Sequence, residues 1–355
     1  MPKELILVIN PGNTSTKVAL YDGMAPLCVE SIKHTDEELS RFSDINAQKD
    51  FREDLIYDYM HKKAIDPGAL RAIAARGGLL KPLASGTYVV DQRMIDDLVA
   101  AKKGFHASNL AAQIGYSMAL KLGITCYIVD PVSVDEAQPL ARYSGHRLFT
   151  RVMLTHALNM KAVAKRFCRE KKLRYEEVTL LVIHLGTGNS ISLHHRGRMV
   201  DAVNPSEEGP FSMDRSGGLP ILQVARHICE SHMEYREFEK MVFGSGGVFS
   251  YLGSKDFLKV KDKYLAGDAQ TIEVVQAMAY QVAKEAGGLA TVVDGRIDAI
   301  IITGGIAFNE FFTDLIRQRI QFIAPVHVYP GEDEMQSLAE GVFRVLKGEE
   351  EAKTY

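Results

Sequence analysis

Two turns of small polar residues, each placed directly after an apolar strand, are the segments of this chain best suited to chemistry. The first lies within Leu5–Asp22, LILVINPGNTSTKVALYD, and the second within Leu180–His195, LLVIHLGTGNSISLHH. Backbone N–H groups and small hydroxyls in such turns bind phosphate oxygens. Because the two segments match and lie about half a chain apart, they indicate an internal duplication. The pair favours a phosphotransferase with two lobes and nucleotide in the cleft.

The first turn carries possible hydrogen-bond donors in Thr14, Ser15 and Thr16, and Lys17 adds a positive charge. Asn-Pro-Gly at its start is also an ordinary turn sequence, so this motif taken alone is weak. The second turn, His184–Ser190, repeats the pattern and makes an ordinary turn a poor explanation for either segment.

A third glycine turn follows the apolar run Ile301–Thr303, where Gly304 and Gly305 precede Ile306. Glycines between a strand and a helix start let backbone N–H groups approach an anion. The same pair also suits a tight turn without any ligand, and both interpretations stay open for this segment taken alone.

Arginines beside glycine pairs form a second kind of candidate. Arg76 stands in Arg-Gly-Gly and Arg215 in Arg-Ser-Gly-Gly. Flexible neighbours allow a guanidinium to extend, and its planar fork binds phosphate or carboxylate through two parallel hydrogen bonds. For each arginine taken alone, a solvated surface position is the alternative.

Two histidines and two acids stand near expected element ends. His184 directly precedes the second turn, and His156 lies at the edge of an expected helix, although a lone histidine is more often structural. Asp130 ends a strand before a proline, and Glu334 begins the last expected helix. Either acid can bind Mg²⁺ through water, and capping or surface exposure is the alternative for both. The sequence contains no Walker A motif, protein-kinase signature or zinc spacing.

The elements that must position these residues alternate as β–α–β. Apolar runs predict strands at 70–75 and 125–129. Helical spacing predicts one helix near 92–102 and another from Ser108, as N-cap, to Gly123. This alternation predicts a mixed sheet covered by helices.

The second half begins after a crossover expected at 136–152. Residues 204–220, NPSEEGPFSMDRSGGLP, show neither the helical nor the strand period of apolar residues. A long structureless loop within a domain is usually functional or mobile. The last helix, about 334–347, has one apolar face and is expected to pack back on the first lobe. The acidic tail Glu349–Glu351 is expected to fray.

The composition limits the class of protein. A length of 355 residues predicts two domains, and 46% hydrophobic with 25% charged residues is ordinary for a globular enzyme. A net charge of −3 with scattered basic residues argues against a nucleic-acid or membrane partner. No apolar run reaches the ~18 residues of a membrane span, and the N-terminus does not resemble a secretory signal. Four cysteines without a Cys-x-x-Cys pair predict reduced thiols in a cytoplasmic protein.

Taken together, these motifs resemble those of the acetate and butyrate kinases, which belong to the acetate kinase–sugar kinase–Hsp70–actin superfamily. The resemblance covers nearly the whole chain in order, is closest to the butyrate kinase branch, and rests most on NPGNTSTK and PSEEGPFSMDRSGGLP. It implies an α/β, two-lobed actin-like or ribonuclease H-like ATPase fold with a duplicated βββαβαβα core and an interlobe cleft. The expected lobes are 1–150, joined by the helix at 336–355, and a nucleotide-binding lobe at 151–335.

The resemblance implies that the chain transfers a phosphoryl group from ATP, with Mg²⁺, to the carboxylate of a short-chain fatty acid. The transfer is expected to be reversible and in line. The resemblance also implies a homo-oligomer. The residues implied as catalytic are Asn10, Lys17, Arg76, His156, His184 and Arg215. Those implied in nucleotide binding are Asn13, Ser15, Gly186, Thr187, Gly188, Asp256, Gly304, Gly305 and Ile306. Asp130 and Glu334 match the acids tied to magnesium.

The chain departs from the acetate kinases in several places. Thr187 replaces an Asn in the second turn, and Leu258 replaces an Arg in the expected nucleotide loop. Gly78 replaces Val and Thr155 replaces Phe, and both changes remove bulk from an expected acyl pocket that includes Pro205. A wider pocket favours butyrate or a branched short-chain acid over acetate, because each buried CH₂ contributes ~0.8 kcal/mol.

Three alternatives remain at this point. An acetate or propionate kinase would differ only in the acid. A sugar kinase of the same superfamily would need a carboxylate base near the acceptor hydroxyl, where this chain offers arginines. A nucleotide-sensing binding protein of the Hsp70 or actin type would work through a partner domain, and the sequence shows none.

Overall fold

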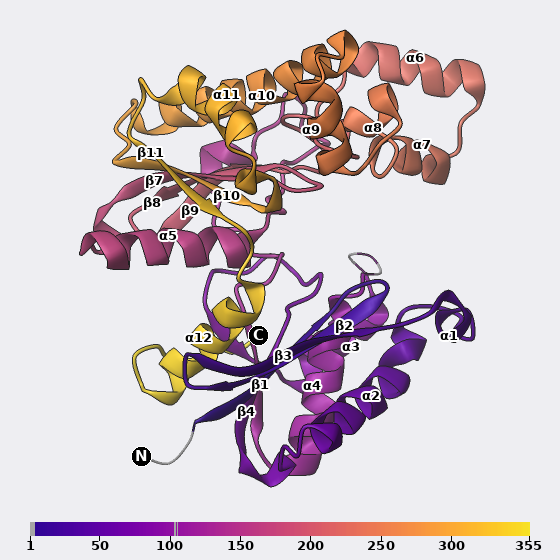
Figure 1. Cartoon of the computed structure of the whole chain (residues 1–355), viewed down its shortest axis with the longest axis vertical. Coiled ribbons are helices and arrows are strands. Elements are labelled where there is room, and N and C mark those ends of the chain that lie inside the picture. Colours follow the sequence, from indigo (N-terminus) through magenta and orange to yellow (C-terminus); the bar gives the residue numbers. More distant parts are fainter. Residues whose placement is uncertain (1–3, 103, 105) are drawn as a thin grey trace. The chain divides into compact units, whose positions relative to one another are not determined.

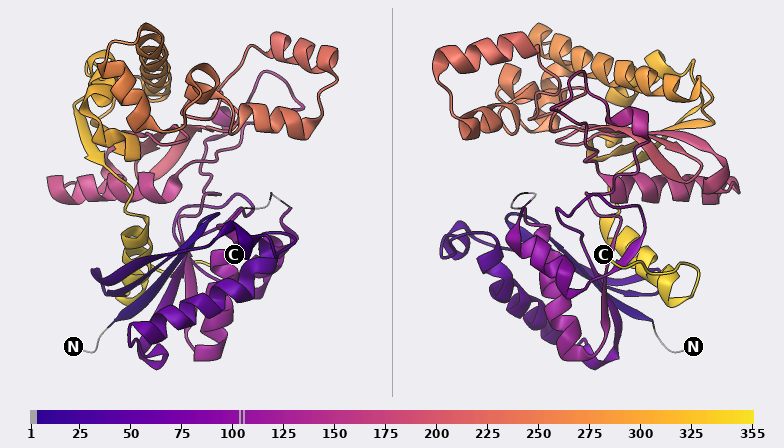
Figure 2. Two further views of the ribbon diagram at one scale, coloured as in Figure 1. Left: turned by 45° about the vertical axis from the view of Figure 1, so that its right-hand side comes forward. Right: turned by 180° about the vertical axis from the view of Figure 1, so that it is seen from behind.

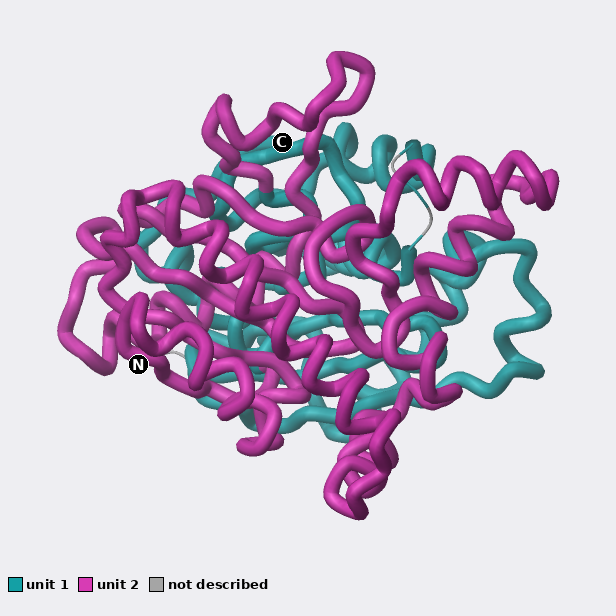
Figure 3. Tube along the Cα trace, turned by 90° about the horizontal axis from the view of Figure 1, so that it is seen from above, with its two compact units in different colours: residues 1–134, 333–355 teal, residues 135–332 magenta. Residues whose placement is uncertain are grey.

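A computed structural model describes residues 4–102, 104 and 106–355, and this part of the chain forms two compact units, each built on one mixed sheet (Figure 1). Figure 3 colours the first unit, Met1–Val134 with Asp333–Tyr355, teal and the second, Asp135–Glu332, magenta. Residues 135–150, expected in the first lobe, belong to the second unit. The Asp135 carboxylate pairs with both Nη atoms of Arg142 at 2.8 Å, and the Gln138 N–H donates to Val200 O at 2.9 Å.

The first sheet has six strands in the order β3-β2-β1-β4-β6-β5. The first three form an antiparallel meander, β4 and β6 continue parallel to β1, and β5 pairs antiparallel with β6. The strands are β1 (Leu5–Pro11), β2 (Ser15–Asp22), β3 (Ala25–Lys33), β4 (Leu70–Ala75), β5 (Thr87–Val89) and β6 (Thr125–Val129).

The second sheet, of five strands in the order β11-β10-β7-β8-β9, repeats this arrangement. Its three-stranded meander is again followed by two strands parallel to the first. The strands are β7 (Thr179–His184), β8 (Ser190–His195), β9 (Arg198–Val203), β10 (Ala299–Gly304) and β11 (Val326–Pro330). The predicted duplication and the actin-like fold class are therefore confirmed.

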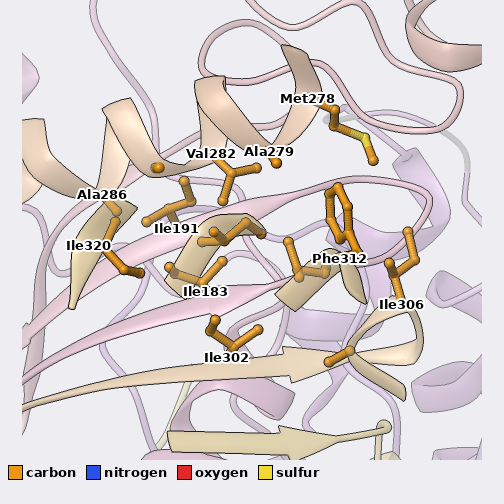
Figure 4. Close-up of a cluster of buried hydrophobic side chains, with 14 of the residues drawn as sticks. Ile183, Ile191, Met278, Ala279, Val282, Ala286, Ile302, Ile306, Phe312 and Ile320 are labelled. Carbon is orange, nitrogen blue, oxygen red and sulfur yellow. The ribbon is translucent and has the colours of Figure 1, made fainter. Parts of the chain in front are cut away.

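The central strands are apolar over most of their length because helices cover both of their faces. In β7, Leu181 and Ile183 join a core with α10, whereas Leu180 and Val182 join a core with α5. Figure 4 shows the α10 side, where Met278 and Val282 project toward the sheet.

Helices of the first unit are α1 (Asp36–Leu39), α2 (Lys49–Lys62), α3 (Gln92–Ala100), α4 (Asn109–Leu122) and α12 (Glu334–Leu346). Those of the second are α5 (Ala157–Lys171), α6 (Ile221–Ser231), α7 (Tyr235–Val242), α8 (Gly247–Leu252), α9 (Phe257–Leu265), α10 (Ala269–Ala290) and α11 (Glu310–Ile320). Short 3-10 helices η1 to η6 cover Asn46–Gln48, Pro67–Ala69, Pro139–Arg142, Tyr175–Glu177, Thr291–Val293 and Gly305–Phe308.

The last helix, α12, returns to the first unit and packs on β1, β4 and β6. Gly341 permits this close packing, because a Cβ there would lie 2.5 Å from Val129 Cγ1. The segment that follows is ordered rather than frayed. Glu350 accepts from the Thr87 N–H at 2.8 Å, and the backbone of Lys353 exchanges hydrogen bonds with the β5 edge.

Ser108 occupies the N-cap position of α4, as predicted, but its side chain makes no capping hydrogen bond. Its backbone is already helical, with φ −62° and ψ −21°, whereas a capping residue needs an extended backbone. Its hydroxyl instead bonds His106 Nδ1 at 2.7 Å. The sequence pattern could not distinguish a capping serine from one committed to a neighbouring ring.

Two features of the helices bear on how the chain meets its surroundings. Helices α6 and α7 contain no buried residue and extend from the rest of the second unit (Figure 2). Within the described residues, every helix is too short or too polar to cross a membrane.

Candidate active site

The first turn connects β1 and β2 and is closed by the Gly12 N–H, which donates to Ser15 O at 2.7 Å. Asn10 and Lys17 flank this turn as directly paired residues of the two strands. Asn13 and Lys17 are exposed and Ser15 is half-buried. The hairpin therefore presents the predicted phosphate-binding groups at one end of the first sheet.

Glu334 connects two of the predicted catalytic residues. Its Oε2 accepts from Asn10 Nδ2 at 2.8 Å, and its Oε1 accepts from Arg76 Nη1. Arg76 comes to lie beside β1 because it directly follows β4, and its N–H donates to Ile9 O at 2.9 Å. Both side chains of the Arg76–Glu334 pair are largely buried, at 14% and 21% exposure. An arginine, an amide and a carboxylate thus form one cluster beside the first turn.

Asp130 serves mainly to hold a neighbouring loop. Its Oδ1 accepts from Ser85 Oγ at 2.6 Å and from the Gly86 N–H at 2.8 Å. These bonds fix the chain between Arg76 and β5 to the end of β6. An acid at position 130 suits this structural role, and it also suits the predicted binding of magnesium.

Gly78 does not open a pocket, which corrects the argument made from the sequence. A Cβ at residue 78 would lie 2.4 Å from Asn109 Oδ1 and 2.8 Å from Leu98 Cδ2. The space that a valine side chain would need is already filled by this chain's own atoms. Comparison of residue size at one position could not reveal that a neighbour had moved into the gap.

In the second unit, His184 ends β7 on the face that α5 covers, and its side chain is fully buried. Asn159 Nδ2 donates to Gly331 O at 3.4 Å, which leaves Asn159 Oδ1 to accept from His184 Nδ1 at 2.8 Å. His184 Nε2 then lies 3.1 Å from Glu332 Oε1 and makes no hydrogen bond of good geometry. A protonated ring would pair with this carboxylate, whereas a neutral ring would offer Nε2 as an acceptor.

His156 stacks on His184, with ring centroids 3.9 Å apart and an interplanar angle of 8°. Its Nδ1 lies 2.9 Å from Ser190 Oγ at the start of β8. The structure therefore brings the two predicted histidines together beside the second turn.

The loop 204–220 folds over this turn and delivers Arg215 to it. Ser212 Oγ donates to Thr187 O, and Asn189 Nδ2 donates to Phe211 O at 3.1 Å. A Cβ on Gly188 would lie 2.4 Å from Arg215 Nη1, so the guanidinium rests against the turn's backbone.

Arg215 is held without a counterion that pairs with it directly. Its Cζ lies 4.4 Å from the centroid of the Phe243 ring, and no group in the described part of the chain accepts a hydrogen bond from its guanidinium. Burial lowers the pKa of Arg215, although the Asp214 charge opposes this effect. A desolvated cation with free donors is suited to binding an anion.

The third glycine turn joins the same cluster. The Leu185 N–H donates to Thr303 O at 2.8 Å, and the Ile306 N–H donates to Leu185 O at 3.1 Å. Gly304 has φ +93°, and a Cβ there would lie 2.3 Å from Leu185 O, so only glycine fits. Gly305 has open space around its Cα. The glycine pair leads into the 3-10 helix Gly305–Phe308 rather than directly into an α-helix.

The remaining predicted residues have the following positions. Asp256 is the N-cap of α9, and its carboxylate accepts from the Leu258 N–H at 2.9 Å, so capping alone accounts for this residue type. Thr155 is buried, and its Oγ1 lacks a hydrogen-bond partner. Pro205 is buried at the start of the loop 204–220. Gly186 is half-buried beside His184, and Thr187 is exposed.

Several polar atoms around the second turn are buried without a hydrogen bond: Thr155 Oγ1, His184 Nε2 and Asn189 Oδ1. Buried polar atoms are rarely left unsatisfied, and each such atom calls for an explanation. A polar ligand with both donors and acceptors would satisfy them. The cluster can therefore bind an anionic group through Arg215 and backbone N–H groups, with the histidines beside it.

Hydrated magnesium fits Glu334 better than Asp130. Each Glu334 oxygen accepts one protein hydrogen bond, and the side chain is partly exposed, so lone pairs remain for bound water. Within the described residues, no three His, Cys, Asp or Glu side chains are grouped to hold a metal by themselves. This arrangement suits an ion that keeps several waters and is bound with substrate phosphates.

Sequence reasoning missed Arg52, Asn159 and Glu332. Arg52 contacts the carbonyl oxygens of the first turn from inside, and the other two residues orient His184. Asn159 could have been found from its spacing, because it lies in the first turn of α5, three residues after the N-cap residue His156. No local sequence signal separated Arg52 from the charged residues around it.

Comparisons with known proteins agree with this arrangement. Residues 141–327 match the Acetokinase family. The chain is 45% identical over 351 residues to butyrate kinase 1 of Clostridium acetobutylicum and 44% identical to its butyrate kinase 2, covering 99% of each chain in both cases. A crystal structure of Porphyromonas gingivalis acetate kinase superposes with a TM-score of 0.78 at 17% identity, covering 97% of this chain and 100% of that one. On the family match and the near full-length similarity, the chain belongs to the acetokinase family.

Proposed function

We propose that this protein is a kinase that transfers the γ-phosphate of ATP to the carboxylate of a short-chain fatty acid, reversibly, with butyrate or a branched short-chain acid as the acceptor. The observation that carries the proposal is the 45% identity to a butyrate kinase over nearly the full length of both chains. An acetate or propionate kinase is the second candidate, favoured by the fold similarity to acetate kinase.

The chemistry of the acceptor gives a reason for the cations found in each of the two units. A fatty acid has a pKa near that of a Glu side chain, about 4.3, and is ionised at pH 7. It attacks phosphorus through a carboxylate oxygen without losing a proton, so no general base is needed. The obstacle is repulsion between the carboxylate and the phosphate chain. Arg76, Arg215 and Lys17, together with the two histidines, would reduce that repulsion as the oxygen approaches in line.

We assign the phosphate contacts to the glycine-containing turns. In the first unit, Asn10, Asn13 and Ser15 would donate to a transferred phosphoryl group. In the second, the nucleotide would lie along Gly186–Gly188 and the turn of Gly304, Gly305 and Ile306, and Asp256, the N-cap of α9, is a further proposed contact. The open space around Gly305 and the free donors of Arg215 support this assignment.

Glu334, with Asp130 as a second candidate, would hold the waters of a bound Mg²⁺. The ion, when bound, neutralises phosphate charge. The chain's own contribution is to fix the Glu334 carboxylate through Asn10 and Arg76, and this fixed carboxylate supports the assignment.

The acid pocket is assigned to Thr155 and Pro205, and the buried, unpartnered Thr155 hydroxyl supports this choice. Gly78 is not assigned to the pocket, because Asn109 and Leu98 fill the space beside it. Chain-length preference therefore rests on similarity to butyrate kinases and on the small side chain at 155, rather than on two independent size changes.

A hydroxamate assay for acyl phosphate tests the proposal. MgATP is supplied with acetate, propionate, butyrate, isobutyrate and valerate in parallel, and glucose-dependent ADP release serves as a control. Highest kcat/KM with a four-carbon acid is expected. Highest kcat/KM with acetate or propionate would support the second candidate, and no acyl phosphate from any acid would contradict both.

We also propose that the protein works in the cytoplasm and as a homo-oligomer. All four cysteines are free thiols, which suits a reducing compartment. Apolar side chains on the unburied α6, Ile221 at 77% and Leu222 at 82% exposure, support self-association. Sedimentation equilibrium would test the oligomer, and a monomer at micromolar concentration would contradict it.

A further inference from the structure

Arg52, on α2, is fully buried, and its guanidinium lies on the inside of the first turn. Its Nη1 donates to Gly12 O at 2.8 Å, to Ser15 O at 3.2 Å and to Thr16 Oγ1 at 3.1 Å. Its Nη2 donates to Asn13 O at 3.1 Å. One side chain thus binds three carbonyl oxygens of the same turn.

These contacts determine which way the turn's N–H groups point. In a planar trans peptide, the C=O of one residue is opposed to the N–H of the next. With Gly12 O and Asn13 O directed at Arg52, the N–H groups of Asn13 and Thr14 point away from it. Successive N–H groups directed to one side form a concave anion site.

The charge of Arg52 is not neutralised by a partner. Its remaining acceptor is Gln48 Oε1, at 3.1 Å from Nε and 2.7 Å from Nη2, so all of its acceptors are uncharged. No carboxylate pairs with it among the residues that the structure describes. Burial lowers the pKa of Arg52 to about 10, so it stays protonated at pH 7.

A buried charge that no counterion offsets is unfavourable, and a bound anion would offset it. The nearest exposed groups of the turn are those assigned to phosphate. An anion on the outer face of the turn would lie opposite the guanidinium, across a single layer of backbone, and would gain from its charge at low local dielectric.

We propose that Arg52 is a positioning residue for the first phosphate-binding turn: it aims the N–H groups of Asn13 and Thr14 outward and supplies the charge that the bound phosphoryl group neutralises. The inference rests on the proposed function for the identity of that anion as a phosphoryl group of the nucleotide. Arg52 contacts the turn through the turn's own carbonyl oxygens and the Thr16 hydroxyl.

Isothermal titration of wild type and variants with ATP and with AMP, both in excess MgCl₂, tests this role. Arg52→Met keeps most of the volume and removes the charge and the donors. Arg52→Lys keeps the charge and an N–H donor group but loses the planar guanidinium that reaches several carbonyl oxygens at once. Arg41→Met is the matched control, because Arg41 is 65% exposed on the same unit. AMP lacks the transferred phosphoryl group and reports on the rest of the nucleotide site.

Arg52→Met should weaken ATP binding by about tenfold or more and AMP binding by less than about twofold, with Arg52→Lys between it and wild type. Arg41→Met should change neither. Equal losses for both nucleotides, or a lower unfolding temperature with unchanged affinities, would overturn the proposal. If Arg52→Met is unfolded by circular dichroism, an unchanged ATP-to-AMP affinity ratio in Arg52→Lys overturns it.

The two proposals fail in different ways. Wild-type protein that prefers ATP to AMP but phosphorylates none of the acids would contradict the proposed function and leave the role of Arg52 intact. Normal acyl phosphate formation, with no effect of Arg52→Met on ATP affinity, would contradict the role of Arg52 and leave the proposed function intact.

Discussion

Gly188 and Arg215 lie in direct contact, although 27 positions separate them in the chain. A Cβ on Gly188 would lie 2.4 Å from Arg215 Nη1 and 2.6 Å from its Cζ. Phe243 contacts the same guanidinium, with its ring centroid 4.4 Å from Cζ. The position of the arginine therefore depends on the absence of a side chain at 188 and on one aromatic ring.

Replacing Gly188 with Ala should displace the Arg215 guanidinium and lower kcat by about tenfold to a hundredfold. The fold should survive, because the flexible end of the arginine can move. Gly287→Ala is the control, since nothing lies within 4 Å of that Cβ position. Steady-state kinetics and thermal unfolding of both variants provide the measurement. A Gly188→Ala enzyme with wild-type kcat would show that the contact is incidental.

Arg215→Ala should lower kcat by roughly 10² to 10³-fold and should weaken nucleotide binding far less. Its contact with the phosphoryl group strengthens as charge shifts in the transition state, which is the condition for a kcat effect. Arg226→Ala on the exposed face of α6 should be neutral. A parallel loss in ATP affinity and an unchanged kcat would instead assign Arg215 to ground-state binding.

The apolar strands and the three glycine turns were predictable because their signals are local. Strand Leu70–Ala75 and the two hairpins follow from apolar runs and polar turns. The family resemblance added which turns would matter. Helices α6 to α9, between the loop and α10, were not predicted, since their short amphipathic segments are interrupted by glycines and acids.

What the sequence could not predict depends on three-dimensional neighbours. Gly78 looked like lost bulk, yet Asn109 fills the space beside it. Arg52 looked like one charge among many on α2, yet its side chain is fully buried. Glu350 looked like part of a solvated tail, yet it accepts from the β5 edge. In each case the deciding contact comes from a residue distant in the chain.

The Arg76–Glu334 pair should show coupling in a double-mutant cycle. Both side chains are mostly buried, and Glu334 also accepts from Asn10, so removal of one partner leaves the other charge poorly compensated. Urea unfolding of Arg76→Met, Glu334→Gln and the double variant should give a coupling energy of about 1 to 3 kcal/mol. The exposed pair Arg296–Asp294 is the control and should give well under 1 kcal/mol. Additive single changes at Arg76 and Glu334 would contradict the expectation.

Removal of residues 349–355 should destabilise the first unit. The segment supplies the hydrogen bonds of Glu350 and Lys353 to β5, and Tyr355 Oη donates to Asp97 Oδ2 at 2.8 Å. Loss of several such bonds at about 1 kcal/mol each should lower the free energy of unfolding by about 2 kcal/mol or more. A chemical unfolding curve measures this. Substituting Glu349 and Glu351 with Gln, with Glu350 kept, should leave the curve unchanged, and an unaffected truncation would show that the segment adds nothing.

The stability of the protein should fall as pH drops below about 6.5, the ordinary pKa of histidine. His194 is fully buried, and its ring bonds Tyr175 Oη and Ser192 Oγ, both at 2.7 Å. Burial, assisted by the charges of Lys161 and Lys165, holds the pKa of His194 well below its usual value. The unfolded chain therefore binds a proton that the folded protein does not, and stability rises with pH across this window.

One such group contributes a slope of up to about 1.4 kcal/mol per pH unit between its folded and unfolded pKa values. His194→Gln should reduce the slope measured by urea unfolding between pH 5 and 7, although the buried His34 and the half-buried His327, whose pKa values are also lowered, keep part of it. His61→Gln, on the exposed end of α2, is the matched control variant. Equal slopes in wild type and His194→Gln would mean that this buried ring is protonated in the folded protein, which its two neutral partners and the adjacent lysines oppose.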